Sequence, residues 1–114
     1  MTSLKYDKPK IDMLISTEDD ELATLLLDLN IADVSITPLV KQDAYTMQDI
    51  VVVINYATAL LGAIKLLLEI IKAHKDKKPN KTKTVIYGRE HITEIQEIVV
   101  KYKESVEIEI RDED

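Results

Sequence analysis

The densest group of chemically capable side chains in this sequence is an acidic run, Glu18-Asp19-Asp20-Glu21. Carboxylates bind hard divalent cations, which need oxygens that converge from several directions. Four consecutive residues of a helix point in different directions, so they do not form such a site by themselves. Acidic residues in a first helical turn are expected anyway, because they stabilise the positive end of the helix dipole. We therefore interpret the run as the start of a helix.

A second candidate for metal binding consists of His91, Glu94 and Glu97, which follow one another at intervals of three residues. His91 is expected to precede the helix that holds the two glutamates, so the three side chains need not share a face. The H-E-x-x-H pattern of zinc sites is absent, and the other histidine, His74, lies in a different segment. The sequence therefore predicts no metal site.

The composition leaves little for catalysis or cofactor binding. Cysteine is absent and there are only two glycines, which excludes thiol chemistry, disulfides and glycine-rich phosphate loops. The serines, at positions 3, 16, 35 and 105, have no acid and base at a recognisable spacing. A formal charge of −6 and five tyrosines spread along the chain argue against nucleic acid as a partner. We predict no catalytic residue, no cofactor and no enzymatic activity.

The length and hydropathy fit one globular domain. The 114 residues are 46% hydrophobic and 32% charged, which is too apolar for a disordered chain and sufficient for one core. We place the domain at residues 10–111, after an N-terminal extension of residues 1–9 and before an acidic tail of residues 112–114. The first residues are charged and lack the apolar core of a signal peptide, so we expect a cytoplasmic protein.

Hydrophobic periodicity predicts an α+β fold with a small sheet of about four strands and helices mainly on one face. Ser16 or Thr17 is expected to cap the first helix, and Thr93 and Gln96 form a capping box for the last one. Pro38 cannot donate a ladder hydrogen bond, so the second strand is expected at an edge. The expected strands cover about 11–16, 33–40, 82–87 and 106–110, and the expected helices about 18–29, 47–73 and 93–103.

The long apolar helix expected over residues 47–73 is the most informative feature. Its polar or small residues fall on one line at alternating spacings of three and four, and nearly all else between Ile50 and Ile71 is apolar. This line consists of Asn55, Thr58, Gly62, Lys65, Glu69 and Lys72. A helix of about 40 Å with so little polar surface exceeds what two short helices and a small sheet can cover.

We therefore expect this helix to associate with a partner, either a second copy of the chain or another protein. The line of small and polar residues would be either a solvent-exposed strip or a seam where two helices approach closely. The expected contact residues are Val51, Val52, Ile54, Asn55, Thr58, Leu60, Leu61, Gly62, Ile64, Leu67 and Leu68.

Three other interpretations stay open. The helix could be wrapped within its own monomer. It could instead serve a membrane-associated protein, with the lysines of residues 72–83 at the lipid headgroups, although Lys65 and Glu69 interrupt the roughly 20 apolar residues that a spanning helix needs. The chain could also be a small regulatory or enzymatic domain of ferredoxin-like plan, which would require a pocket with converging polar groups.

The order of the parts resembles the first class of the effector-associated constant component family of bacterial conflict (anti-phage defence) systems. The resemblance runs from about Ile11 to Ile110. It rests on the segments KIDMLIS, EDDELATLLLDL, ADVSITPLV, DIVVVINYATALLGAIKLLLEIIKAHK, KTKTVIYG and TEIQEIVVKY. It implies a small non-catalytic adaptor for an effector protein, often protease-like or another toxic enzyme, of a defence system.

Overall fold

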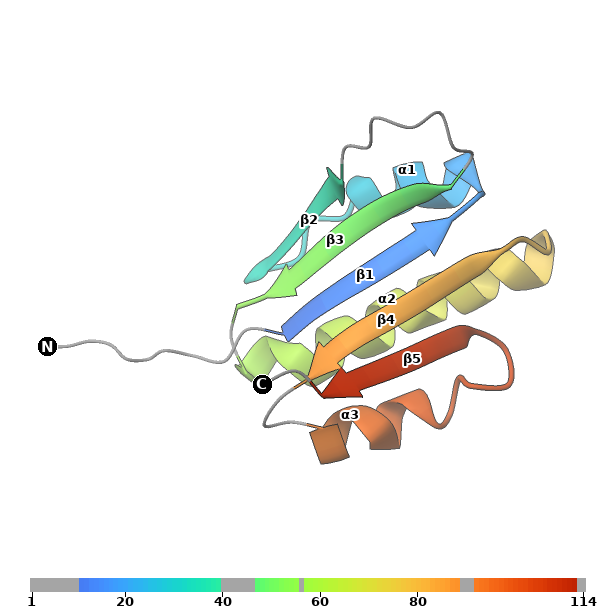
Figure 1. Ribbon diagram of the computed structural model, residues 1–114. Helices are drawn as coiled ribbons and strands as arrows, with labels where there is room; N and C mark the ends of the chain where they lie inside the picture. The colour runs from blue at the N-terminus through green and yellow to red at the C-terminus, as the bar shows by residue number, and fades with distance from the viewer. Residues whose placement is uncertain (1–10, 40–46, 56, 89–91, 113–114) are drawn as a thin grey trace, which may run out of the picture.

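Five strands and three helices make up the described part of the chain (Figure 1). The computed structural model describes residues 11–39, 47–55, 57–88 and 92–112, without the side chains of residues 57–60 and 112. In chain order the elements are β1 (Ile11–Thr17), α1 (Asp20–Leu27), β2 (Val34–Leu39), β3 (Gln48–Ile54), α2 (Ala57–Lys77), β4 (Thr82–Gly88), α3 (Ile92–Val99) and β5 (Glu107–Asp112).

The strands form one sheet in the order β2-β3-β1-β4-β5. All neighbours are antiparallel except β4 and β5, which are parallel and are joined through α3. The first four strands and two helices follow the β-α-β-β-α-β order of the ferredoxin-like, or split βαβ, arrangement. The unit α3–β5 extends this sheet by one parallel strand at the β4 edge (Figure 1).

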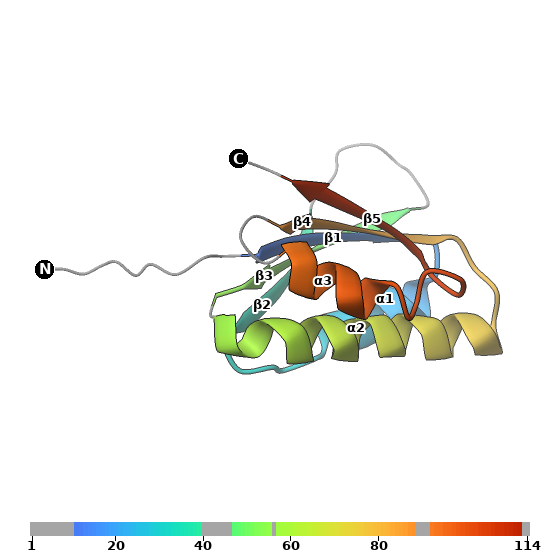
Figure 2. The same ribbon diagram turned by 90° about the horizontal axis from the view of Figure 1, so that it is seen from below.

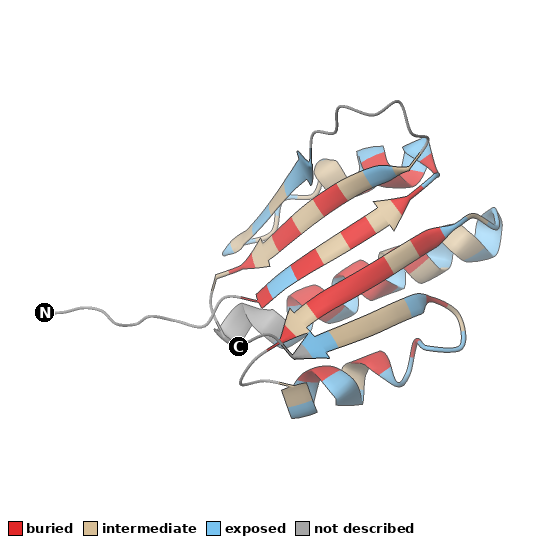
Figure 3. Ribbon diagram, in the orientation of Figure 1, coloured by how far each residue is buried: buried red, intermediate tan, exposed pale blue. Residues whose placement is uncertain are grey.

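All three helices lie against the same face of the sheet, as Figure 2 shows. Between the helices and the sheet lies one core of fully buried side chains, because alternate strand residues and one stripe of each helix point into it. In β1, for example, Met13 and Ile15 are at most 1% exposed, whereas Leu14 between them is only partly buried. Figure 3 shows buried residues alternating with less buried ones along β1 and β3.

The long apolar helix expected over residues 47–73 is wrong, and the expectation of four strands is wrong with it. Its first part, Gln48–Ile54, is strand β3 in the middle of the sheet, and α2 begins only at Ala57. Every residue from Ile50 to Ile54 is β-branched, and such side chains are restricted in a helix but pack well on a pleated sheet. The remaining helix α2 is amphipathic, with a buried stripe of Ala63, Ile64, Leu67, Leu68 and Ile71.

Smaller expectations met different outcomes. The edge position of Pro38 is confirmed, because β2 pairs with β3 alone among the described strands. The N-cap of α1 is Asp19 rather than Ser16 or Thr17, since its carboxylate accepts the N–H groups of the first turn. Thr93 lies inside α3, which begins at Ile92, so the capping box expected there is wrong. The expected N-terminal extension lies outside the described residues.

The helices were also compared with the length and hydropathy that a membrane span requires. In the residues that the structure describes, none of the three helices is both long enough and apolar enough to cross a bilayer.

Candidate functional site

The residues expected to contact a partner through one helix are divided between two elements. Val51, Val52 and Ile54 belong to β3, where Val52 and Ile54 point into the core and Val51 points to the opposite face. Asn55 follows this strand and donates its backbone N–H to the carbonyl of Asp33 at 2.9 Å. The single continuous interface predicted from the sequence is therefore absent.

Three of the five α2 residues in that set whose burial is described are already covered by the chain itself. Ile64, Leu67 and Leu68 have no exposed surface, so they stabilise the monomer and offer nothing to a partner. Leu61 is 41% exposed, and the nearby Gly62 has no described atom within 4 Å of the position a Cβ would take. Gly62 therefore belongs to the solvent-exposed strip and makes no close helix approach within this chain. The side chains of Thr58 and Leu60 are not described.

The face of the sheet opposite the helices is covered by none of the described helices, and we call it the open face (Figure 2). The pairing register sets side chains of adjacent strands next to one another across this face. Val51, Leu14 and Val85 are direct neighbours in the centre, and Val85 is only 7% exposed. The middle row of side chains on the open face consists, from β2 to β5, of Thr37, Val51, Leu14, Val85 and Glu109.

Two further rows flank this middle row. Val53 and Tyr87 add apolar surface beside Leu14, on either side of Asp12. The two flanking rows, from β2 to β5, are Ser35, Val53, Asp12, Tyr87 and Arg111, and Leu39, Asp49, Ser16, Lys83 and Glu107. The open face therefore has an apolar centre with a charged border along β4 and β5.

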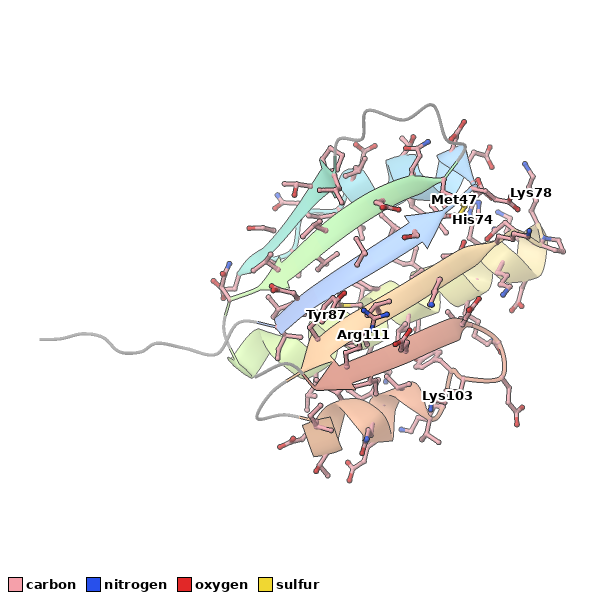
Figure 4. All side chains as sticks on the ribbon, viewed as in Figure 1. Met47, His74, Lys78, Tyr87, Lys103 and Arg111 are labelled. Carbon is pink, nitrogen blue, oxygen red and sulfur yellow. The ribbon has the colours of Figure 1, made fainter. Side chains whose placement is uncertain are left out.

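The charges on the β4–β5 border form a small network. Glu109 accepts from Arg111 Nε at 2.7 Å and lies 3.3 Å from Lys83 Nζ. These two hydrogen bonds hold the pKa of Glu109 below its ordinary value, so it is ionised at neutral pH. The Arg111 guanidinium also lies 5.9 Å from the centre of the Tyr87 ring (Figure 4). The border thus presents both signs of charge next to an aromatic ring.

A second group of interacting polar residues lies at the other end of the sheet, where α1 begins and α2 ends. His74 Nε2 donates to Asp19 Oδ2 at 3.0 Å, and the same nitrogen is 3.9 Å from Glu21 Oε1. Figure 4 places His74 at this end of the molecule, near Lys78. Asn80 Nδ2 donates to the same Asp19 oxygen at 3.2 Å, so one carboxylate joins three segments of the chain.

Asp19 is held in a fixed position within this cluster. Its side chain is 4% exposed, and its Oδ1 accepts the N–H groups of Glu21 at 2.9 Å and Leu22 at 3.3 Å. Burial by itself raises the pKa of Asp19, but the hydrogen bond from the Leu22 N–H, the charge of His74 and the Glu21 N–H together hold it below the ordinary value. Asp19 is therefore a buried carboxylate that stays ionised at neutral pH.

Threonine hydroxyls support the cluster from the ends of β1 and β4. The hydroxyl groups of Thr17 and Thr82 lie 2.8 Å apart, and Thr82 donates to Asn80 Oδ1 at 2.5 Å. The backbone N–H of Asp19 donates to Thr17 Oγ1 at 3.1 Å. A pocket of about 400 Å³ opens beside these residues and is lined by Glu18, Asp19, Asp20, Glu21, Lys78, Pro79 and Asn80.

The cluster was missed at the level of sequence because its members come from segments far apart in the chain. The prediction that the acidic run starts a helix is confirmed, but the sequence gives no reason to place His74 beside it, because His74 lies in another segment. Asp19 and His74 are 55 residues apart, and no spacing rule connects them. The one indication that Asp19 and His74 lie close together is that the two helices, α1 and α2, pack on the same side of one sheet. The other histidine, His91, lies outside the described residues.

The chain was compared with protein-family models, with curated proteins and with solved structures. None of these comparisons finds a match.

Proposed function

We propose that this protein is a non-catalytic scaffold whose open sheet face packs against the same face of a second copy. The resemblance noted above supplies the wider proposal, an adaptor that joins an effector protein of a bacterial defence system. The observation that carries the first proposal is the apolar centre of the open face, where Leu14 and Val51 are partly exposed and which none of the described helices covers (Figure 2). The proposed interface is therefore the open face of the sheet and not the long helix expected from the sequence, because residues 48–54 of that helix are strand β3.

The apolar centre supports association because it is continuous across three strands. Leu14, Val51 and Val85 are direct neighbours, and Val53 and Tyr87 adjoin them. None of the described helices lies on this side of the sheet (Figure 2). Apolar patches of this kind on a monomer commonly mark an interaction site, because covering them removes hydrocarbon from water.

The charged border supports a second copy as the occupant. A two-fold axis along the middle row would place the apolar centres of two copies against each other. It would also place Arg111 opposite Glu107 and Tyr87 opposite Lys83, because these pairs lie on opposite sides of that row. Glu109 would meet its own copy, but its charge is already balanced by Lys83 and Arg111. Along β4 and β5 the charged border is therefore complementary to itself.

The area of the open face indicates how tightly two copies are expected to bind. Five strands about 4.8 Å apart and about seven residues long cover roughly 550 Å² per copy. The two copies together would bury about 1,100 Å², which is at the low end of the areas of specific interfaces. We expect a weak dimer with a dissociation constant in the micromolar range.

The first experiment is analytical ultracentrifugation over a concentration series from about 1 µM to about 1 mM, which spans that range. We expect the wild-type chain to pass from monomer to dimer and Val51→Glu to remain monomeric, because a carboxylate would be placed in the apolar centre. Leu66→Glu on α2 is the matched control, since Leu66 is 44% exposed on the helical side. A wild-type chain that stays monomeric, or a dimer lost only in Leu66→Glu, contradicts the proposal.

A charge reversal tests the proposed contact between Arg111 of one copy and Glu107 of the other. Both residues are exposed, so their replacement leaves the core intact. Arg111→Glu should weaken the dimer, and adding Glu107→Arg to the same chain should restore much of the affinity. Each variant is first checked for folding by circular dichroism. If the double variant is as weak as the single one, the proposed two-fold arrangement is wrong.

The wider adaptor role is tested by co-expression with the product of the neighbouring gene. The adaptor proposal expects the two proteins to co-purify, and it fails if they elute separately at concentrations above those of the cell. Self-association and effector binding are measured separately, so either proposal can fail without the other.

A further inference from the structure

We propose that Asp19, Glu21 and His74 form a binding site for a divalent transition-metal ion of the zinc type, with a fourth position open to the adjoining pocket. The site lies at the end of the sheet where α1 begins and α2 ends. It rests on the geometry of these three side chains and is independent of the proposed self-association.

The ligand atoms are spaced as such an ion requires. His74 Nε2 is 3.0 Å from Asp19 Oδ2 and 3.9 Å from Glu21 Oε1, and all three ligand atoms lie within 4.8 Å of one another. Tetrahedral zinc with bonds of about 2.0–2.2 Å separates its ligand atoms by about 3.3–3.6 Å. The observed distances fall on both sides of that value, so small side-chain movements suffice.

Two of the three proposed ligands are held in place, and the third is exposed to solvent. Asp19 is fixed by the N–H groups of Glu21 and Leu22 on one oxygen and by Asn80 on the other. His74 is 16% exposed at its side chain and is carried by the rigid helix α2. Glu21 is 77% exposed, so it is free to close onto an ion held by the other two. Outer-shell hydrogen bonds of the kind that Asn80 makes orient ligands in known metal sites.

The donor set selects the class of ion. One imidazole nitrogen with two carboxylates suits zinc and its neighbours, whereas calcium takes six to eight oxygens and magnesium prefers an octahedral oxygen shell. The adjoining pocket of about 400 Å³ leaves room for a water molecule as the fourth ligand. Four acidic residues and one lysine, Lys78, line this pocket, so its net negative charge favours the approach of a cation.

A purely structural role for the same residues makes a different prediction. In that case His74 only fastens the end of α2 to the start of α1 through its hydrogen bond with Asp19. His74→Gln separates the two roles, because the glutamine amide is a donor able to replace this hydrogen bond but is a poor zinc ligand. Asp19→Asn is less informative, since Asp19 also caps α1.

The experiment is isothermal titration calorimetry of the full chain, with any affinity tag removed and the metal stripped by a chelator, using zinc chloride as the titrant. We expect one saturable site per chain, weakened in His74→Gln and in Glu21→Gln. The loss should exceed the roughly 10- to 100-fold that removal of an outer-shell partner causes. His91→Gln, which alters the other histidine, is the matched control and should bind as the wild type does.

Cobalt(II) provides a second readout, because its visible absorption bands are strong only in tetrahedral or five-coordinate sites. The wild type and His91→Gln should develop these bands, and His74→Gln should not. The proposal is overturned if the wild type shows no saturable binding. It is also overturned if His74→Gln binds as tightly as the wild type, or if His91→Gln alone abolishes binding.

Discussion

The two faces of the sheet use neighbouring residues of the same strands for different purposes. Val52 has no exposed surface and packs beneath the helices, whereas Val51, one residue earlier, is only partly buried on the open face. Both are valines in one central strand, so intrinsic strand propensity does not distinguish them. What differs is that α1, α2 and α3 cover one face alone (Figure 2). The covered face therefore supplies the buried core, and the open face is the surface that we propose for association.

The charged side chains of the two faces differ in burial as the valines do. At the rim of the covered side, Asp19 is buried and makes hydrogen bonds to fixed donors from three segments. On the open face, Glu109 makes its ion pairs with Lys83 and Arg111 in contact with solvent. Buried charge-assisted hydrogen bonds are costly to break, whereas exposed pairs contribute little.

The largest expected effect comes from a truncation on the covered face. Ile15→Ala should lower the free energy of unfolding by about 2–5 kcal/mol, because it leaves a cavity beside side chains that have no room to collapse. Leu14→Ala, at the adjacent position on the open face, should cost about 1 kcal/mol. Urea unfolding of both variants at a concentration where the protein is monomeric measures the difference. Equal losses would contradict the distinction between the faces.

The next largest effect is expected at the rim of the covered side. Asp19→Ala removes the N-cap of α1 and the acceptor for His74, and should cost about 1–2 kcal/mol. Thermal unfolding in the presence of a chelator measures this loss without a contribution from bound metal. Thr24→Ala, on the exposed side of the same helix, is the control and should change stability little.

A smaller effect is expected from the hydrogen bond between α2 and the segment after α3. Tyr102 donates to Glu69 Oε2 at 2.8 Å, so Tyr102→Phe should cost about 1 kcal/mol. Burial, with the Glu69 hydrogen bond and charge, raises the pKa of Tyr102. The folded state therefore resists deprotonation, and this stabilisation is present below about pH 10 and is lost as the pH rises through the folded-state pKa. Unfolding measured from pH 7 to 12 should show the two proteins converging at high pH.

The smallest effect is expected from the ion pairs of the open face. Lys83→Met should leave the stability of the monomer unchanged within error at high salt, because the pair with Glu109 is exposed and screened. The measurement is the midpoint of thermal unfolding at low and high ionic strength. A large loss of stability at high salt would show that this border is part of the core.

Much of the fold follows from local pattern. The strands β1, β2 and β4 and the helices α1 and α3 lie within a few residues of their expected positions, because alternation and helical stripes are set by backbone geometry. The wrong prediction of a helix over Gln48–Ile54 has a specific cause: an apolar run fits a buried strand and a helix equally well. The five consecutive β-branched residues from Ile50 to Ile54 were the signal that favoured a strand.

The candidate sites were less accessible to sequence reasoning. Leu14 and Val85 are 71 positions apart in the printed sequence, and only the register of β1 with β4 makes them neighbours. Asp19 and His74 likewise meet because two helices pack on one side of the sheet. The expected partner association stays a prediction that the proposed experiments address, and the absence of catalysis and the cytoplasmic location also stay predictions.

The sequence by itself determined which residues alternate, which segments are apolar and which familiar catalytic patterns are missing, because these depend on neighbours along the chain. Tertiary structure alone decided which side of each strand is covered and which distant polar groups meet. The physical reason is that helices can cover either face of an alternating strand at similar local cost. Only the path of the chain across the sheet selects one face and leaves the other open.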